Sequence, residues 1–134
     1  MKLTTICSIL TPPVAMLSIP LVSYAADSLQ VQFSWSATKA CSTTPPAFRI
    51  ADVPKGTKYL SFRLADYNAS FNHGGGEIAY KGSGAIPAGA FGGGYQGPCP
   101  PTGQTHTYEW TVDALDANKN VLAEGKATGQ FPVK

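Results

Sequence analysis

Charged side chains are scarce in this chain: Asp, Glu, Lys and Arg make up 13% of its 134 residues. Ten basic and eight acidic residues give a formal net charge of +2, and the basic residues are scattered along the sequence. A protein that holds nucleic acid or an anionic membrane surface by electrostatics needs a basic patch or stripe. The composition therefore argues against both kinds of partner.

Long apolar segments are also lacking, apart from one at the N-terminus. Residues 1–25 begin with the basic Lys2, continue with an apolar stretch and end in Ser-Tyr-Ala at 23–25, with small residues at the positions that signal peptidase prefers. Prolines interrupt the stretch, which disfavours a membrane-spanning helix. We predict a cleaved secretory signal over 1–25, one domain over 26–134, and a secreted or periplasmic protein without a membrane span.

Cysteine is rare, with three residues in the whole chain. Cys7 lies inside the predicted signal, so the mature domain keeps Cys41 and Cys99. Two cysteines in an exported domain most often form one disulfide, and we predict this pairing. The alternative, a reactive thiol or a metal ligand, lacks a local Cys-x-x-Cys or Cys-His spacing.

Helical periodicity is hard to find over any long segment. Short runs with a period of two instead alternate with Gly- and Pro-rich connectors, which predicts an all-β domain with little helix. Strands are expected over residues 29–35, 59–66, 77–81, 106–116 and 121–134. A tight turn at 54–56 and another at 117–120 separate some of them.

Two of the expected strands carry polar groups on their apolar faces. Parity places Asp66 on the inward face of the 59–66 strand, at its end. It places His106 and Tyr108 on the inward face of the 106–116 strand, at its beginning. A carboxylate on such a face must find partners or lie at the mouth of a cavity. The pattern predicts a site at the edge of the core.

The segment between these strands is rich in glycine. Residues 74–76 and 92–94 are glycine triplets, which allow an unusual φ or a close approach of backbone to a ligand. His-Gly-Gly-Gly at 73–76 matches the oxyanion segment of lipase-like hydrolases, but that fold also needs a Gly-x-Ser-x-Gly elbow, which this chain lacks. A hydrolase is therefore disfavoured.

Simpler interpretations of the polar residues remain open. Asp66, His73 and His106 are the residue types of a two-histidine, one-carboxylate metal site, although their spacing differs from that of compact structural zinc motifs. A histidine at the start of a strand is also often just exposed or satisfied by hydrogen bonds. The shared parity of His106 and Tyr108 favours a site over that simpler interpretation.

Residues 97–116, GPCPPTGQTHTYEWTVDALD, resemble the signature of phosphatidylethanolamine-binding proteins, also called Raf kinase inhibitor-like, and especially their bacterial and archaeal members. Residues 41–66 resemble the family's earlier run of Cys, Pro, Pro-x-Gly-Thr-Lys and a strand ending in Asp. The resemblance covers most of 41–116. It implies a small secreted β-sheet domain with an anion-binding pocket.

The resemblance also implies which residues line that pocket: an aspartate ending one strand, a following histidine, a Gly-Pro corner, and a histidine and tyrosine opening another strand. The corresponding ligand-binding residues here are Asp66, His73, Gly97, Pro98, His106 and Tyr108. A phosphate-type or phospholipid head group is the implied ligand, bound without catalysis. The alternative is a secreted inhibitor or signalling partner that acts through protein–protein contacts. No catalytic residue, metal or cofactor is predicted.

The sequence departs from the family's pattern at three places. Asp-Tyr-Asn at 66–68 stands where the family usually has Asp-Pro-Asp. The family usually places a tryptophan after a histidine on a strand, whereas His73 precedes three glycines. The usual long insertions and terminal helix are also lacking.

Overall fold

The structure, a computed structural model, describes residues 28–134 and consists of seven strands. The predicted signal at 1–25 lies outside the described residues. The strands are β1 (Gln30–Phe33), β2 (Phe48–Ala51), β3 (Tyr59–Asp66), β4 (Gly75–Ala79), β5 (Ala85–Ile86), β6 (His106–Leu115) and β7 (Val121–Phe131). Residues 28–134 contain no helix, and so none that could cross a membrane.

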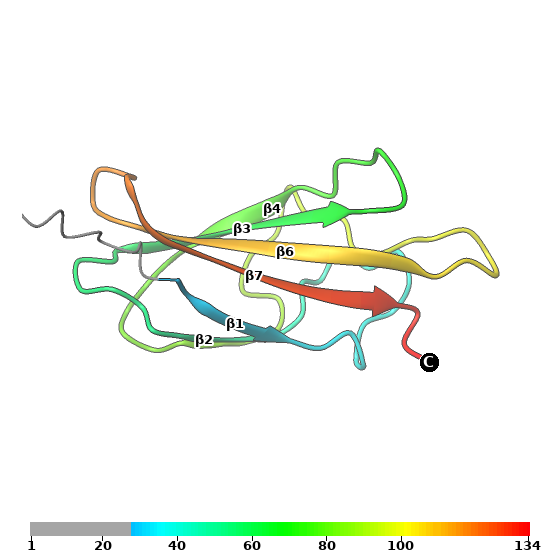
Figure 1. Cartoon of the computed structure of the whole chain (residues 1–134), viewed down its shortest axis with the longest axis horizontal. Helices are drawn as coiled ribbons and strands as arrows, with labels where there is room; N and C mark the ends of the chain where they lie inside the picture. Colours follow the sequence, from blue (N-terminus) through cyan, green and yellow to red (C-terminus); the bar gives the residue numbers. More distant parts are fainter. Residues whose placement is uncertain (1–27) are drawn as a thin grey trace, which may run out of the picture.

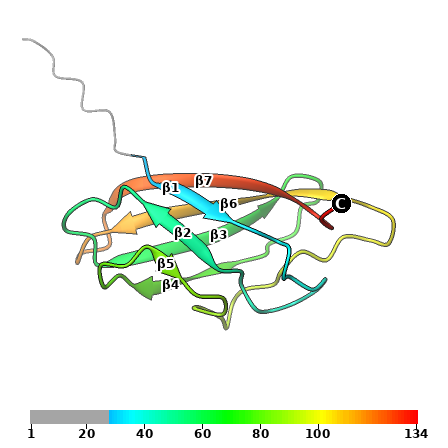
Figure 2. The ribbon, with the colours of Figure 1, turned by 90° about the horizontal axis from the view of Figure 1, so that it is seen from below.

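The strands form two antiparallel sheets. The larger sheet has the order β4-β3-β6-β7 and the smaller has the order β1-β2-β5. The smaller sheet lies over the larger one, as Figures 1 and 2 show. Two sheets packed in this way bury one face of each, which is why the strands alternate between apolar and polar residues.

Aromatic side chains fill the space between the sheets. Phe48 of β2 lies with its ring centroid 4.9 Å from that of Phe62 of β3 and 5.1 Å from that of Trp110 of β6. Phe62 is 1% exposed and Trp110 is fully buried. Aromatic pairs at these separations add to the stabilisation from burial alone. The all-β class predicted from the alternating pattern is therefore confirmed.

Most expected strands occur where the sequence places them. The strands predicted over 59–66, 106–116 and 121–134 correspond to β3, β6 and β7, and β1 falls within 29–35. The turn at 54–56 is also present, with φ of 88° at Gly56. The strand expected at 77–81 instead runs over Gly75–Ala79. A β-carbon on Gly76 would lie 2.7 Å from the ring of Phe91, so this strand needs glycine for packing.

Strand β2 was not predicted from the sequence, although its residues alternate. Phe48 and Ile50 are buried, and Arg49 between them is exposed. The strand has only four residues and follows a Pro-Pro pair at 45–46, so the alternation extends over too few residues to identify a strand. β2 is nevertheless the centre of the smaller sheet.

The predicted disulfide between Cys41 and Cys99 is present. Two backbone hydrogen bonds lie beside it: the Cys41 N–H donates to the Pro98 carbonyl at 2.8 Å, and the Gly97 N–H donates to the Ser42 carbonyl at 2.8 Å. The disulfide therefore joins two loop segments that also pair through their backbones. The proline-rich corner is therefore held both by the covalent bond and by backbone hydrogen bonds.

We predict that the double variant Cys41→Ala/Cys99→Ala loses about 4 kcal/mol of unfolding free energy, the chain-entropy value for cysteines separated by 58 residues. Urea unfolding of the variant and the wild type measures this difference. Reducing the wild type with a thiol serves as the control and is expected to give a similar loss. A variant as stable as the oxidised wild type would contradict the prediction.

Candidate functional site

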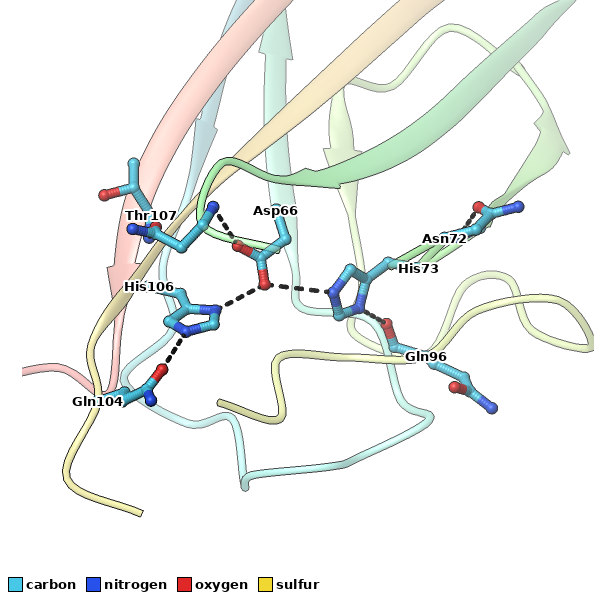
Figure 3. A network of polar contacts seen from close by, with 9 residues as sticks. Asp66, Asn72, His73, Gln96, Gln104, His106 and Thr107 are labelled. Atoms are coloured by element: carbon cyan, nitrogen blue, oxygen red, sulfur yellow. Dashed lines mark hydrogen bonds and ion pairs between the residues drawn. The ribbon is translucent and has the colours of Figure 1, made fainter. Parts of the chain in front are cut away.

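The site lies where β3 ends and β6 begins. The two strands are antiparallel neighbours, and their register pairs Asp66 with Tyr108. The last polar residue of one strand therefore meets the first polar residues of the other at the same end of the sheet. Figure 3 shows Asp66 between the rings of His106 and His73. The inward placement predicted by parity is confirmed, since Tyr108 is fully buried and His106 is 7% exposed.

Asp66 and His106 form a tightly held pair. The Nδ1 of His106 lies 2.8 Å from Oδ2 of Asp66, and the side chain of Asp66 is 3% exposed. The Nε2 of His106 lies 2.9 Å from Oε1 of Gln104, the amide oxygen. Both ring nitrogens of His106 are thus paired, which fixes the orientation of the imidazole.

The other carboxylate oxygen of Asp66 holds the loop that follows β3. Its Oδ1 accepts a hydrogen bond from the Asn68 N–H at 2.7 Å, which closes an Asx turn. The Asn68 side chain accepts from the Thr107 N–H at 2.7 Å, and the Tyr67 N–H donates to the Thr107 carbonyl at 2.9 Å. A proline at position 67 could not donate this bond. Tyr-Asn in place of Pro-Asp therefore ties this loop to β6.

His73 approaches Asp66 from the other side. Its Nδ1 lies 2.7 Å from the carbonyl oxygen of Gln96, and its Nε2 lies 3.8 Å from Oδ2 of Asp66. The side chain is 3% exposed, and Nε2 has no hydrogen-bond partner among residues 28–134. The neighbouring Gly74 has φ of 68°, and a β-carbon there would lie 1.8 Å from the Gly94 carbonyl. This glycine permits a close approach of protein backbone, rather than of a ligand.

The ionisation of Asp66 and Tyr108 reflects this environment. Burial raises the pKa of Asp66, but hydrogen bonds from His106 and from the Asn68 N–H, with the charges of both imidazoles, leave it below its ordinary value of 3.8. Burial, followed by the charge of Asp66, raises the pKa of Tyr108 to about 12. At neutral pH the carboxylate is therefore ionised and the phenol keeps its proton.

These groups line a pocket of about 580 Å³. Its lining residues are Cys41, Thr43, Asp66, Asn68, Ala69, Phe71, His73, Gln96, Gly97, Cys99, Pro101, Gln104, His106 and Tyr108. Within the described part of the chain, this lining includes no Lys or Arg. Phe71 is 51% exposed, and its ring meets that of His73 edge-on at 4.7 Å. The pocket thus combines a polar floor with an aromatic group beside it.

The structure brings together five of the six residues predicted to bind a ligand, all except Pro98. Pro98 is fully buried and is not among the lining residues, and its carbonyl accepts a hydrogen bond from the Cys41 N–H. Gly97 lines the pocket, but its N–H is already bonded to Ser42, and a β-carbon on it would lie 2.6 Å from the Ser42 carbonyl. The Gly-Pro corner therefore shapes the pocket without a free Gly97 donor.

Several residues of the site were missed by the sequence analysis. Gln96 and Gln104 orient the two imidazoles, and neither stands in a pattern that reveals this. Asn68 could have been found, because Asp-x-Asn after a strand is typical of an Asx turn. Phe71 lies in a loop, where neither period two nor helical spacing identifies a pocket residue.

Asp66, His73 and His106 do converge, as the metal-site alternative required. Across residues 28–134, however, no group of three or more His, Cys, Asp or Glu residues is arranged to hold a metal ion. One oxygen of Asp66 faces both rings, at 2.8 Å and 3.8 Å. The observed contacts are those of a hydrogen-bonded polar cluster.

The family model described as phosphatidylethanolamine-binding protein matches residues 19–132. Among solved structures, the chain is similar to a phosphatidylethanolamine-binding protein homologue from Chlamydia trachomatis, with a TM-score of 0.59 and 16% identity over 81% of this chain and 99% of that one. It is also similar to YbcL of E. coli, with a TM-score of 0.57 and 21% identity over 80% and 99%. At these identities the likeness shows the fold. The comparison with curated proteins gives no match.

We predict that Asp66→Asn lowers the unfolding free energy at pH 7 by about 1.5–3 kcal/mol, the range for hydrogen bonds to a charged group. Because the pKa of Asp66 is lowered in the fold, its stabilisation is present above its ordinary value of 3.8 and is lost as the pH falls through the folded-state pKa. Urea unfolding at pH 7 and in acid should show the difference between variant and wild type shrinking below about pH 4.

The control for this prediction is Asp52→Asn. Asp52 is exposed and has φ of 60°, a conformation that asparagine tolerates. This variant is expected to keep wild-type stability at both pH values. Equal stability of Asp66→Asn and wild type at pH 7 would contradict the role given to Asp66.

Proposed function

We propose that this chain, which belongs to the phosphatidylethanolamine-binding protein family, binds a small anionic head group of the phosphate type in the pocket at the ends of β3 and β6. Family membership supports a ligand-binding or regulatory role in general. The observation that carries the finer proposal is a polar pocket floor with a buried group, Nε2 of His73, that has no hydrogen-bond partner in residues 28–134.

Buried polar groups are normally hydrogen-bonded, and an unsatisfied one destabilises the fold by about 1–3 kcal/mol. Tyr108 keeps its phenolic proton, because its pKa is raised to about 12, and so it can donate to a ligand oxygen. Imidazoles add further donors when protonated. A phosphate or carboxylate offers several oxygen acceptors to such a set.

We further propose that the pocket binds its ligand without catalysis. A histidine that activates a nucleophile must lie within hydrogen-bond reach of it. In the described part of the chain, the ring nitrogens of His106 contact Asp66 and Gln104, and those of His73 face Gln96 and Asp66. Neither ring is hydrogen-bonded to a serine, threonine or cysteine side chain.

Exposed aromatic residues in the loop after β3 suit a ligand with an apolar part. Phe71 is 51% exposed and lines the pocket, and Tyr67 in the same loop is 59% exposed. A phospholipid would place its head group on the polar floor and its apolar part near Phe71. The same exposed rings favour the second candidate, an inhibitor or signalling partner that docks through its surface. That role stays a prediction of the family resemblance.

We predict that phosphoethanolamine raises the melting temperature of the wild type at pH 6. A ligand at one hundred times its Kd stabilises the folded state by about 2.7 kcal/mol. The variant His106→Ala should show little or no shift, because it removes one imidazole and leaves Asp66 without that partner. Differential scanning fluorimetry with phosphate and with phosphoethanolamine, at millimolar concentrations, measures both.

The matched control is Arg63→Gln. Arg63 is 61% exposed and pairs with Asp113, away from the pocket lining. This variant is expected to keep the wild-type shift with ligand. The absence of any shift in the wild type at millimolar ligand would argue against the proposed function, and an undiminished shift in His106→Ala would argue against the proposed site.

We also propose that the protein is exported. If residues 1–25 are a cleaved signal, N-terminal sequencing of the protein recovered from a secreting host will begin at Ala26. Replacing the small residue Ala25 with a bulky one should block processing and leave a longer chain. Recovery of an unprocessed wild-type chain in the cytoplasm would contradict this proposal.

A further inference from the structure

The geometry of His73 determines which ring nitrogen is unprotonated in the neutral imidazole. Its Nδ1 lies 2.7 Å from the carbonyl oxygen of Gln96, and a carbonyl oxygen only accepts. Nδ1 therefore carries the hydrogen, and Nε2 of the neutral ring is a lone-pair acceptor. That acceptor is buried, belongs to a residue that lines the pocket, and has no hydrogen-bond partner among residues 28–134.

The charged and titratable groups that face this ring do not favour an anion. From β3, Asp66 places Oδ2 3.8 Å from Nε2. From β6, His106 shares that carboxylate, and the neutral phenol of Tyr108 lies edge-on to the ring at 5.4 Å. No Lys or Arg of the described chain lines the pocket. Asp66 therefore places a negative charge beside an unpaired acceptor, and both disfavour an anion at this ring.

A proton on Nε2 of His73 removes both features that disfavour an anion, the unpaired acceptor and the uncompensated negative charge. It turns the unpaired acceptor into a donor, and its charge balances that of Asp66. The distance of 3.8 Å to Asp66 is too long for a hydrogen bond, so the new N–H stays available to an oxygen in the pocket. Each change favours an incoming oxyanion.

Resting on the proposed function, we propose that the pocket binds its oxyanion together with one proton, which is taken from solvent and held at Nε2 of His73. One N–H bond forms, and no other covalent bond changes. The bound ligand is the fully ionised form of an oxyacid, such as a phosphate monoester dianion, and its negative charge faces an imidazolium. Ligand affinity is therefore coupled to pH through this one ring.

The test counts protons during binding of phosphoethanolamine to the wild-type protein. Isothermal titration calorimetry is run in two buffers with different ionisation enthalpies, above the second phosphate pKa of about 6. The pH is one at which the imidazole nitrogen spectrum of the free protein shows a bare Nε2 on His73. We expect uptake of about one proton per ligand, and an affinity that falls about tenfold for each further pH unit.

Binding without proton uptake overturns this inference and leaves the proposed function standing. If phosphoethanolamine does not bind at pH 6 or at any higher pH, the proposed function itself is overturned.

A second measurement locates the proton. The chain has two histidines, so a long-range proton–nitrogen spectrum contains two imidazole rings, and the variant His73→Gln assigns them. We expect Nε2 of His73 to become protonated when ligand binds. The glutamine amide offers a donor that does not titrate but carries no charge to balance Asp66, so His73→Gln is expected to bind more weakly and with no proton uptake. A bare Nε2 in the liganded wild type, or uptake of one proton by the variant, overturns the inference.

Discussion

The buried side chain of Asp66 organises the end of this molecule where β3 stops and β6 begins. Asp66 receives hydrogen bonds from His106 and from the backbone of Asn68, and it lies beside His73. An unpaired charge at this depth would strongly destabilise the fold, so each of these partners is required by the presence of the carboxylate. The turn after β3 and the position of His106 at the start of β6 follow from that requirement, whereas the His73 ring is oriented by the Gln96 carbonyl.

The rest of the fold keeps these partners in register. The antiparallel pairing of β3 with β6 sets Asp66 opposite Tyr108. Both strands also pack through aromatic side chains against Phe48 of the smaller sheet. The Cys41–Cys99 disulfide is part of the pocket lining, since both cysteines are among the lining residues. Both buried histidines of the domain thus lie at this end, beside Asp66.

The sequence predicted the strand-borne part of this site and little of the loop-borne part. A strand has a period of two, so the inward placement of Asp66, His106 and Tyr108 could be worked out from neighbours alone. His73 came only from the family resemblance, because its position depends on how the loop before β4 folds back against Gln96. Pro98 was expected in the pocket and is not among its lining residues, since parity does not govern a proline-rich corner.

The central claim is that the ends of β3 and β6 form a binding site for a phosphate-type anion. The most direct test is a titration of the nitrogen-labelled wild-type protein with phosphoethanolamine, followed through its backbone amide resonances. We predict saturable shifts confined to residues 66–74 and 96–108, which hold most of the pocket lining, and to the residues around Cys41. Shifts centred on another surface, or no saturable shift at millimolar ligand, would contradict it.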